Sequence, residues 1–301
     1  MDSSPTFSLL QSRSWRNYEL LDSGDGCKLE RFGQYIFARP EVQAMWDRAL
    51  PAKDWSAADA TFLPTNEENG GHWAFKKKEP ERWEMMYQLA GGAGLRFWAM
   101  PTAGRHLGVF PEAAPHWDFI AAATRRSSRN DVNVLNLFGY TGLASLAAAA
   151  AGAHVTHVDA SRKSVTWARE NQTLSGLDDR PIRWIVDDAL KFVEREGRRG
   201  ARYDGIILDP PKFGRGPKGE VWEAFKSLPR LMKACQGILS RQPLFIILTA
   251  YAVKTSALHI AEVLSEITRD RGGSMELGEL VTPEKSAGRL LSQAVFARWA
   301  H

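Results

Sequence analysis

Residues 132–159 decide the fold class. The stretch begins with Val132-Asn133-Val134-Leu135-Asn136-Leu137, continues as Phe138-Gly139-Tyr140-Thr141-Gly142 into an alanine-rich segment, and ends with His154-Val155-Thr156-His157-Val158-Asp159. The first and last runs are mostly apolar and of strand length, whereas residues 143–151 are strong helix formers that end at Gly152. This order of strand, helix and strand predicts two neighbouring parallel strands of one sheet.

The alternation continues downstream of this stretch. The pattern predicts helices at 163–174, 189–196 and 228–239, with strands at 182–186, 205–209 and 244–249. We therefore expect an α/β fold of Rossmann-like type, with a mostly parallel sheet and helices on both faces. Ligands of such sheets bind outside the carboxyl ends of the strands, so candidate site residues are sought there.

The first hundred residues are typical of strands and turns. Residues 18–21 and 28–32 flank a turn-rich segment and predict one hairpin, and residues 72–76 and 82–87 predict a second. A short helix is expected at 41–50, directly after Pro40. We predict a small β-rich domain over 1–104, with a possible role in substrate recognition, and a catalytic domain over 105–301. Most of its tryptophans are expected to pack its core.

The turn that follows the strand at 132–137 is the first candidate site. Gly139 and Gly142 allow the backbone to turn sharply and to approach a ligand closely. The Gly-x-Gly-x-x-Gly spacing of dinucleotide sites is absent, which argues against a nicotinamide cofactor.

The next two strand ends each carry an acid. Asp159, followed by Ala160, can accept hydrogen bonds from the ribose hydroxyls of an adenosine, because Ser161 is the better cap for the next helix. One acid of Asp187-Asp188-Ala189 can accept from the adenine amino group. We favour Asp188, although either acid could instead cap the helix that follows.

The fourth segment reads Asp209-Pro210-Pro211-Lys212-Phe213 and follows an apolar strand. The two prolines fix the backbone and leave carbonyls without competing amide donors, so Asp209 and the Pro210 carbonyl form an acceptor pair. Phe213 is placed to stack on a planar base. Lys212 could hold a phosphate or be solvated. The polar glycine-rich segment 214–219 is a candidate for a lid over the substrate.

These segments together carry a resemblance. From about residue 107 onward, the chain resembles the bacterial class I methyltransferases of large-subunit ribosomal RNA, which make 5-methylcytosine and 7-methylguanine. The resemblance implies S-adenosyl-L-methionine as cofactor and RNA as substrate. It also implies cofactor contacts by the turn and by the acids at three strand ends, namely Asn136, Phe138, Gly139, Tyr140, Thr141, Gly142, Asp159, Ala160, Asp188, Ala189 and Asp209. Asp209, Pro210, Lys212 and Phe213 are the expected catalytic residues.

The chain departs from that family at the position of its catalytic cysteine. The 5-methylcytosine enzymes carry a Ser-Cys-Ser run after the fifth strand, where this chain has Thr249-Ala250-Tyr251. Neither Cys27 nor Cys235 is placed to replace that thiolate. Because C5 of cytosine needs covalent activation, we expect direct in-line methylation of a base nitrogen instead. The segment 108–112 also lacks the charged residues that the family has there.

Composition limits the alternatives. The net charge is +4 with a pI of about 9.1, and basic clusters lie at 76–78, 125–129 and 195–202, which suits either RNA binding or a solvated surface. Two distant cysteines, the absence of long apolar stretches and an unremarkable residue sequence at 1–5 predict a cytoplasmic protein without a metal site, a membrane span or a signal peptide. A protein or small-molecule methyltransferase and a catalytically silent cofactor-binding protein remain alternatives, and the oligomeric state stays open.

Overall fold

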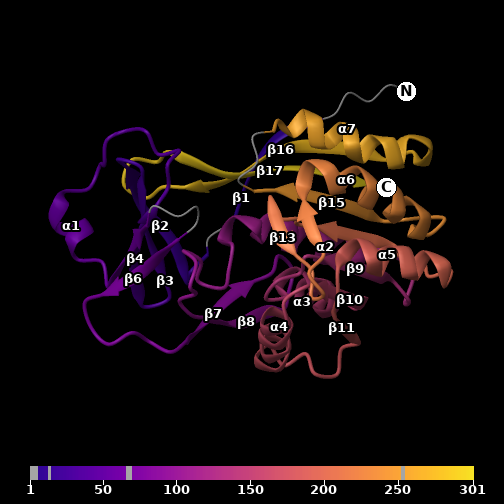
Figure 1. Ribbon diagram of the computed structural model, residues 1–301, viewed down its shortest axis with the longest axis horizontal. Helices are drawn as coiled ribbons and strands as arrows, with labels where there is room; N and C mark the ends of the chain where they lie inside the picture. Colours follow the sequence, from indigo (N-terminus) through magenta and orange to yellow (C-terminus); the bar gives the residue numbers. More distant parts are fainter. Residues whose placement is uncertain (1–5, 13–14, 66–69, 252–254) are drawn as a thin grey trace.

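A computed structural model describes residues 6–12, 15–65, 70–251 and 255–301, so residues 1–5, on which the expectation about a signal peptide rested, lie outside it. Its largest sheet has eight strands in the order β1-β16-β17-β15-β12-β9-β10-β11 (Figure 1). The strands are β1 (Thr6–Gln11), β9 (Asn133–Leu137), β10 (His154–Asp159), β11 (Ile182–Val186), β12 (Gly205–Leu208), β15 (Phe245–Ala250), β16 (Ser274–Pro283) and β17 (Leu290–Ala300). Only β17 is antiparallel to its neighbours, which confirms the expected mostly parallel sheet.

Helices cover both faces of this sheet. They are α2 (Ala114–Arg126), α3 (Leu143–Ala150), α4 (Arg162–Leu174), α5 (Ala189–Arg198), α6 (Ala224–Ile238) and α7 (Ala257–Thr268). Alternate side chains of the central strand β12 point to opposite faces of the sheet, as in any pleated strand. Ile206 and Leu208 pack in a core with α5, α6 and α7, whereas Ile207 packs in a core with α2 and α3. The Rossmann-like fold predicted from the sequence is confirmed.

The N-terminal part forms two smaller sheets. One contains β2 (Tyr18–Gly24), β3 (Cys27–Phe32), β4 (Tyr35–Pro40), β5 (Ala60–Pro64) and β6 (Gly71–Phe75), and the other contains β7 (Trp83–Gln88) and β8 (Gly94–Ala99). The β2–β3 hairpin was predicted correctly. The predicted second hairpin was wrong, because β6 pairs with β5 and β7 pairs with β8. Alternating apolar residues identified these strands as strands but did not specify their partners.

The helix predicted at 41–50 was also wrong. Backbone carbonyls of this segment accept hydrogen bonds from the β2–β3 turn, at 2.9 Å for Gly26 N to Ala44 O and 2.8 Å for Asp25 N to Trp46 O. The amides of Ala49 and Leu50 donate to the carboxylate of Asp22. These contacts replace helical bonds, and the only helix nearby is the short α1 (Ala52–Ser56).

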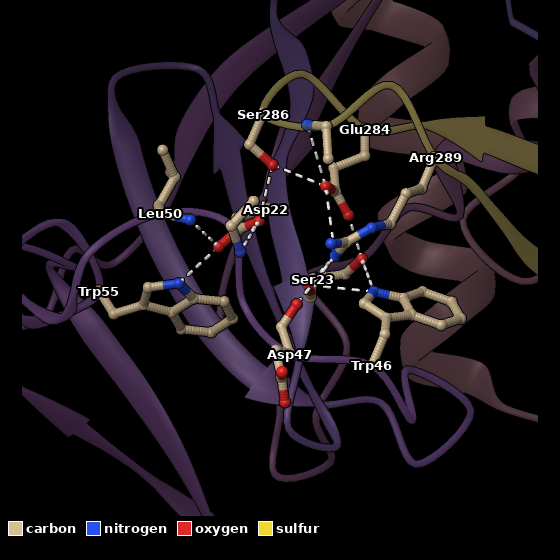
Figure 2. A network of polar contacts seen from close by, with 11 residues as sticks. Asp22, Ser23, Trp46, Asp47, Leu50, Trp55, Glu284, Ser286 and Arg289 are labelled. Atoms are coloured by element: carbon tan, nitrogen blue, oxygen red, sulfur yellow. Dashed lines mark hydrogen bonds and ion pairs between the residues drawn. The ribbon is translucent and has the colours of Figure 1, made fainter.

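The long β16–β17 hairpin, which the sequence analysis did not predict, joins the two parts of the molecule. In Figure 1 it runs from the large sheet to the N-terminal sheet. At its tip the buried Glu284 carboxylate accepts hydrogen bonds from the hydroxyls of Ser23 and Ser286 and lies 3.8 Å from the guanidinium of Arg289 (Figure 2). The Ser286 hydroxyl also lies 2.6 Å from the Asp22 carboxylate, so Asp22 and Glu284 share its single O–H donor. The hairpin tip is therefore fixed to β2 by a buried polar network.

The domain boundary expected at residue 104 stays a prediction. Strand β1 of the N-terminal segment pairs with β16 at the edge of the large sheet, over Thr6 to Gln11. The strands that follow it, β2 to β6, form a separate sheet. The nearby tryptophans Trp15, Trp55 and Trp83, which lie outside that sheet, are buried in the adjoining cores. The expectation that most of these tryptophans pack a core holds for these three.

Candidate active site

A cavity of about 710 Å³ lies at the carboxyl ends of β9, β10, β11 and β12. The N-terminal sheet forms its opposite wall through Lys28 and Arg39. Most of the residues singled out from the sequence line this cavity: Phe138, Tyr140, Asp159, Ala160, Asp188, Ala189, Asp209, Pro210, Lys212 and Phe213. The four strand ends chosen from the sequence thus meet in one place, as the fold requires.

The turn after β9 has an unusual backbone. Phe138 and Tyr140 have φ angles of +58° and +48°, a region that costs energy for residues other than glycine and that is concentrated at functional sites. A Cβ atom on Gly139, which lies between them, would stand 2.3 Å from Cε1 of the buried His157 ring. Gly139 is therefore required by the close approach of the protein's own side chain.

The other predicted residues of the turn, Asn136, Thr141 and Gly142, are not among the residues lining the cavity. Asn136 donates to the hydroxyl of Ser145 at 2.9 Å, and the Thr141 hydroxyl donates to the Gly108 carbonyl at 2.7 Å. Gly142 has a φ of +88° and begins α3. These residues support the turn through contacts within the protein, and their expected contacts with a cofactor stay a prediction.

Asp159 holds the turn from the neighbouring strand. Its carboxylate accepts hydrogen bonds from the backbone amides of Tyr140, at 2.9 Å, and Ser161, at 2.8 Å. Ser161 caps α4 by accepting from Ser164 N, as expected from the sequence. Burial raises the pKa of Asp159, and the two amide hydrogen bonds oppose that rise. Each carboxylate oxygen can still accept a further hydrogen bond from a ligand.

The two acids after β11 have different partners. Asp187 forms an ion pair with Arg195 at 2.6 Å. Asp188 caps α5, because its Oδ1 accepts from Lys191 N at 2.9 Å. The capping role that the sequence left open for either acid belongs to Asp188. Its Oδ2 has no hydrogen bond in the described part of the chain, so this acid remains the better candidate for an adenine contact.

Asp209 is the most strongly perturbed acid of the cavity. Burial and the nearby carboxyl group of Glu112 raise the pKa of Asp209 to about 8. The turn beyond it is fixed by Trp222, whose indole donates to the Pro211 carbonyl at 2.7 Å and whose ring lies 4.8 Å from that of Phe138. A carboxyl group with this pKa can exchange a proton near neutral pH.

The segment 214–219, the candidate lid, contains the end of one strand and the turn of a two-stranded ribbon, and its role as a lid stays a prediction. Strands β13 (Phe213–Arg215) and β14 (Val221–Glu223) pair antiparallel, and Ala224 N donates to Lys212 O at 3.0 Å. Phe213 is 58% exposed on this ribbon, and the Lys212 ammonium lies 5.1 Å from its ring centroid. The glycines of the segment are compatible with a hairpin, which the sequence reasoning did not consider.

The sequence analysis missed the wall formed by the N-terminal sheet. Lys28 lies 3.1 Å from Glu41, and Arg39 forms a buried ion pair with Glu30 at 2.5 Å. Although burial opposes it, these two cations lower the pKa of Glu30 to about 2. Burial and the neighbouring arginines Arg39 and Arg105 lower the pKa of His106 to about 3, so its imidazole is neutral. No sequence signal placed this sheet against the strand ends, because the β16–β17 hairpin brings it there.

Neither cysteine lies in the cavity wall. Cys235 is buried in α6, where burial raises the pKa of its thiol to about 12, and Cys27 lies in β3. Within the described ranges, no group of three or more His, Cys, Asp or Glu side chains could hold a metal ion. No helix in those ranges is long and apolar enough to cross a membrane.

A family profile and a solved structure point to the same family, and a further structure shows the fold. A family profile described as S-adenosylmethionine-dependent methyltransferase matches residues 89–259. A crystal structure of a SAM-dependent methyltransferase from Agrobacterium tumefaciens is 46% identical, with a TM-score of 0.91, over 100% of this chain and 97% of that one. The tRNA m1G37 methyltransferase of M. jannaschii shares the fold, with 13% identity and a TM-score of 0.51, over 94% and 74% of the two chains.

Among curated proteins, the similarity is confined to a short region. Ribosomal RNA large subunit methyltransferase I of Klebsiella pneumoniae (strain 342) is 36% identical over 82 residues, which is 27% of this chain and 18% of that protein. The same enzyme of Tolumonas auensis is 29% identical over 126 residues, which is 42% of this chain and 31% of that protein. The matched part thus spans less than a third of each of these two relatives.

Proposed function

Because this chain belongs to the family of S-adenosylmethionine-dependent methyltransferases, we propose that it methylates a nitrogen of an RNA base by direct in-line transfer. Ribosomal RNA is the favoured substrate. The observation that carries the proposal is the meeting of the Asp159, Asp188 and Asp209 strand ends in one cavity that the basic N-terminal wall closes. The cytoplasm is the proposed location, since both cysteines are free thiols.

The cavity residues fit S-adenosylmethionine. Asp159 offers carboxylate oxygens to the ribose hydroxyls, and Asp188 offers its Oδ2 to the adenine amino group, one strand further along the sheet edge. The strained turn at Phe138 and Tyr140 offers backbone groups to the methionine part. The cofactor supplies a methyl group that is already activated as a sulfonium, so the protein's task is positioning.

On the acceptor side, Asp209 and the Pro210 carbonyl provide oxygen acceptors for an amino group or a ring N–H. Since the pKa of Asp209 is raised to about 8, its carboxylate form is a suitable acceptor for the proton that nitrogen methylation releases. Phe213 and Lys212, at the edge of the cavity, suit a base and a phosphate respectively. The absence of a cysteine from the cavity wall as described supports nitrogen rather than C5 of cytosine.

Two further observations favour RNA over other acceptors. The curated relatives are named for ribosomal RNA, and the chain has a net charge of +4. Arg105, Lys212 and Arg215 border the cavity, where cations would attract the phosphates beside a target base.

The test is a transfer assay with labelled S-adenosylmethionine. RNA, protein and metabolite fractions from cells that lack this gene would be incubated separately with the purified protein. Label in the RNA fraction, recovered as an N-methylated base, is the expected result. Label confined to protein or to metabolites would overturn the RNA substrate, recovery of 5-methylcytosine would overturn nitrogen transfer, and cofactor binding without label in any fraction would show a silent binding protein.

A further inference from the structure

Three polar side chains to which the sequence analysis gave no role line the same cavity as Asp209. Glu112 belongs to the 3-10 turn Pro111–Ala113, Tyr251 directly follows β15, and Gln293 lies in β17. They come from three separate parts of the chain and line one cavity. This convergence is independent of the strand ends assigned to the cofactor.

Tyr251 presents a buried hydroxyl group. Its Oη has no hydrogen-bond partner among the residues that the structure describes, and its ring lies 5.2 Å from that of Phe110. Burial raises the pKa of Tyr251 well above its ordinary value, and the carboxyl groups of Glu112 and Asp209 raise it further. The phenol therefore stays protonated and available as a donor next to two carboxyl groups.

Gln293 presents a second donor. Its Oε1 accepts a hydrogen bond from the Lys28 ammonium at 2.8 Å. Because an ammonium group can only donate, this contact fixes the orientation of the amide and leaves Nε2 as the free end. The Nε2 atom is buried and has no partner within the described residues. A buried donor without a partner is costly and rare in folded proteins, which points to a ligand that completes it.

Glu112 adds a carboxyl group to that of Asp209. It is buried, and burial raises its pKa despite the opposing influence of Lys28 and Arg39. Its negative charge raises the pKa of both Asp209 and Tyr251, in addition to the larger effect of their burial. The cavity lining thus combines two donors, on Tyr251 and Gln293, with two carboxyl groups and the aromatic ring of Phe110.

We propose that Tyr251, Gln293 and Glu112 form with Asp209 an acceptor subsite for an uncharged heteroaromatic ring whose edge carries both N–H groups and lone pairs. This inference rests on the proposed function, since a nucleobase is such a ring. The carboxyl groups accept from its N–H groups, while Tyr251 Oη and Gln293 Nε2 donate to its lone pairs. A lysine ammonium, the acceptor expected in a protein substrate, has only donors and would leave both of those atoms unpaired.

The subsite is tested with Tyr251→Phe and Gln293→Glu. The first keeps the ring against Phe110 and removes only the hydroxyl, and the second keeps a partner for Lys28 but replaces the Nε2 donor with an oxygen. Initial rates would be measured with total RNA from cells lacking this gene, and cofactor binding by calorimetry. Each variant is expected to raise the RNA KM or lower kcat/KM by about three- to tenfold, as expected for one hydrogen bond, with cofactor Kd within about twofold.

Tyr203→Phe serves as the matched control, because it also removes a buried phenol hydroxyl, here one that donates to Glu196 at 2.8 Å outside the cavity. It is expected to leave the RNA KM unchanged. The subsite would be overturned if Tyr251→Phe and Gln293→Glu behaved like this control, or if they weakened cofactor binding as much as RNA use. Label entering protein instead of RNA would contradict the proposed function. The two variants would then be measured with that protein as substrate, and a protein KM unchanged from the wild type would separately overturn the subsite.

Discussion

The carboxylate of Asp159 accepts a hydrogen bond of 2.9 Å from the backbone amide of Tyr140, a residue whose φ angle is +48°. The acid at the end of β10 therefore holds the strained turn at the end of β9 in place. A residue predicted to contact the ribose is also a positioning residue for the neighbouring turn. This bond and the backbone bond of 3.1 Å from Gly139 N to Val158 O together couple the two sides of the proposed cofactor site.

Replacing Asp159 by Ala is expected to weaken S-adenosylmethionine binding by about ten- to a hundredfold, since hydrogen bonds to charged groups contribute about 1.5–3 kcal/mol. Calorimetric titration of the purified variant measures the change. Ser161→Ala is the control, because it removes the side chain that caps α4 and lowers stability by about 1 kcal/mol, while the backbone amide of residue 161 can still donate to the Asp159 carboxylate. Unchanged cofactor affinity in Asp159→Ala would refute the placement of the ribose.

Adding one methyl group at Gly139 should disturb the turn at Phe138 and Tyr140 through a clash with the protein's own core. The new Cβ would meet the His157 ring at 2.3 Å, and that ring is fully buried and held 3.0 Å from the Ser145 hydroxyl. Gly139→Ala is expected to lower the free energy of unfolding by about 1–3 kcal/mol, measured by urea denaturation. Gly237→Ala, where a Cβ meets nothing within 4 Å, should be neutral or slightly stabilising, and equal effects of the two variants would contradict this explanation.

Ionisation of the buried Asp209 should lower the free energy of unfolding at neutral and alkaline pH. Its pKa rises on folding from 3.8 to about 8, so between these values the folded protein binds more protons than the unfolded chain, and stability falls as pH rises from about 4 to about 8. Asp209→Asn is therefore expected to be more stable than the wild type at pH 8, by a few kcal/mol at most, since one pKa unit corresponds to about 1.4 kcal/mol.

Thermal unfolding of both proteins between pH 5 and pH 9 measures this difference. The gain should be smallest at pH 5 and should reach its limit above pH 8, and methyl transfer should fall in the variant. A gain that is independent of pH would show that the acid is ionised in the folded state.

Glu284→Ala should separate the hairpin tip from β2. The substitution leaves the Ser23 hydroxyl and the Arg289 guanidinium without their buried partner, at an expected cost of about 2–4 kcal/mol in chemical denaturation. Lys285→Ala on the same turn is the control, because it removes only an exposed ion pair with Glu19 and should cost less than about 1 kcal/mol. Similar losses in the two variants would argue against a special role for the network.

Most strands and helices between residues 132 and 250 could be predicted because their signals are local, although the short β13 and β14 could not. Apolar runs such as 205–208 are buried on both faces, and the acids that follow them fall at one sheet edge by topology alone. The pairing of β6 with β5 could not be predicted, since alternation marks a strand and not its partner. The wall that carries Lys28 and Arg39 depends on contacts between residues more than 200 positions apart, such as Lys28 with Gln293.

Within the site, too, roles that depend on neighbouring residues could be predicted from the sequence, and roles that depend on distant residues could not. Ser161 was identified as a cap from its neighbours, whereas the raised pKa of Asp209 comes from burial in the fold and from Glu112, about a hundred residues away in the sequence. Tyr251 was recorded only as a departure from a family pattern. Its significance comes from a hydroxyl group that finds no partner in the described structure, which no local pattern encodes.

The place of β1 in the large sheet has a consequence for the order in which the molecule can assemble. Within the described sheet, residues 6–11 pair with β16, at residues 276–281, so this edge strand has no place to dock until about 270 further residues have been synthesised. Contacts with so large a sequence separation close late and slowly. Until β16 is available, the backbone groups of β1 lack their strand partner, and the side chains of Phe7 and Leu9 stay exposed even in the folded protein, at 60% and 51%, so the unpaired strand could pair with other chains.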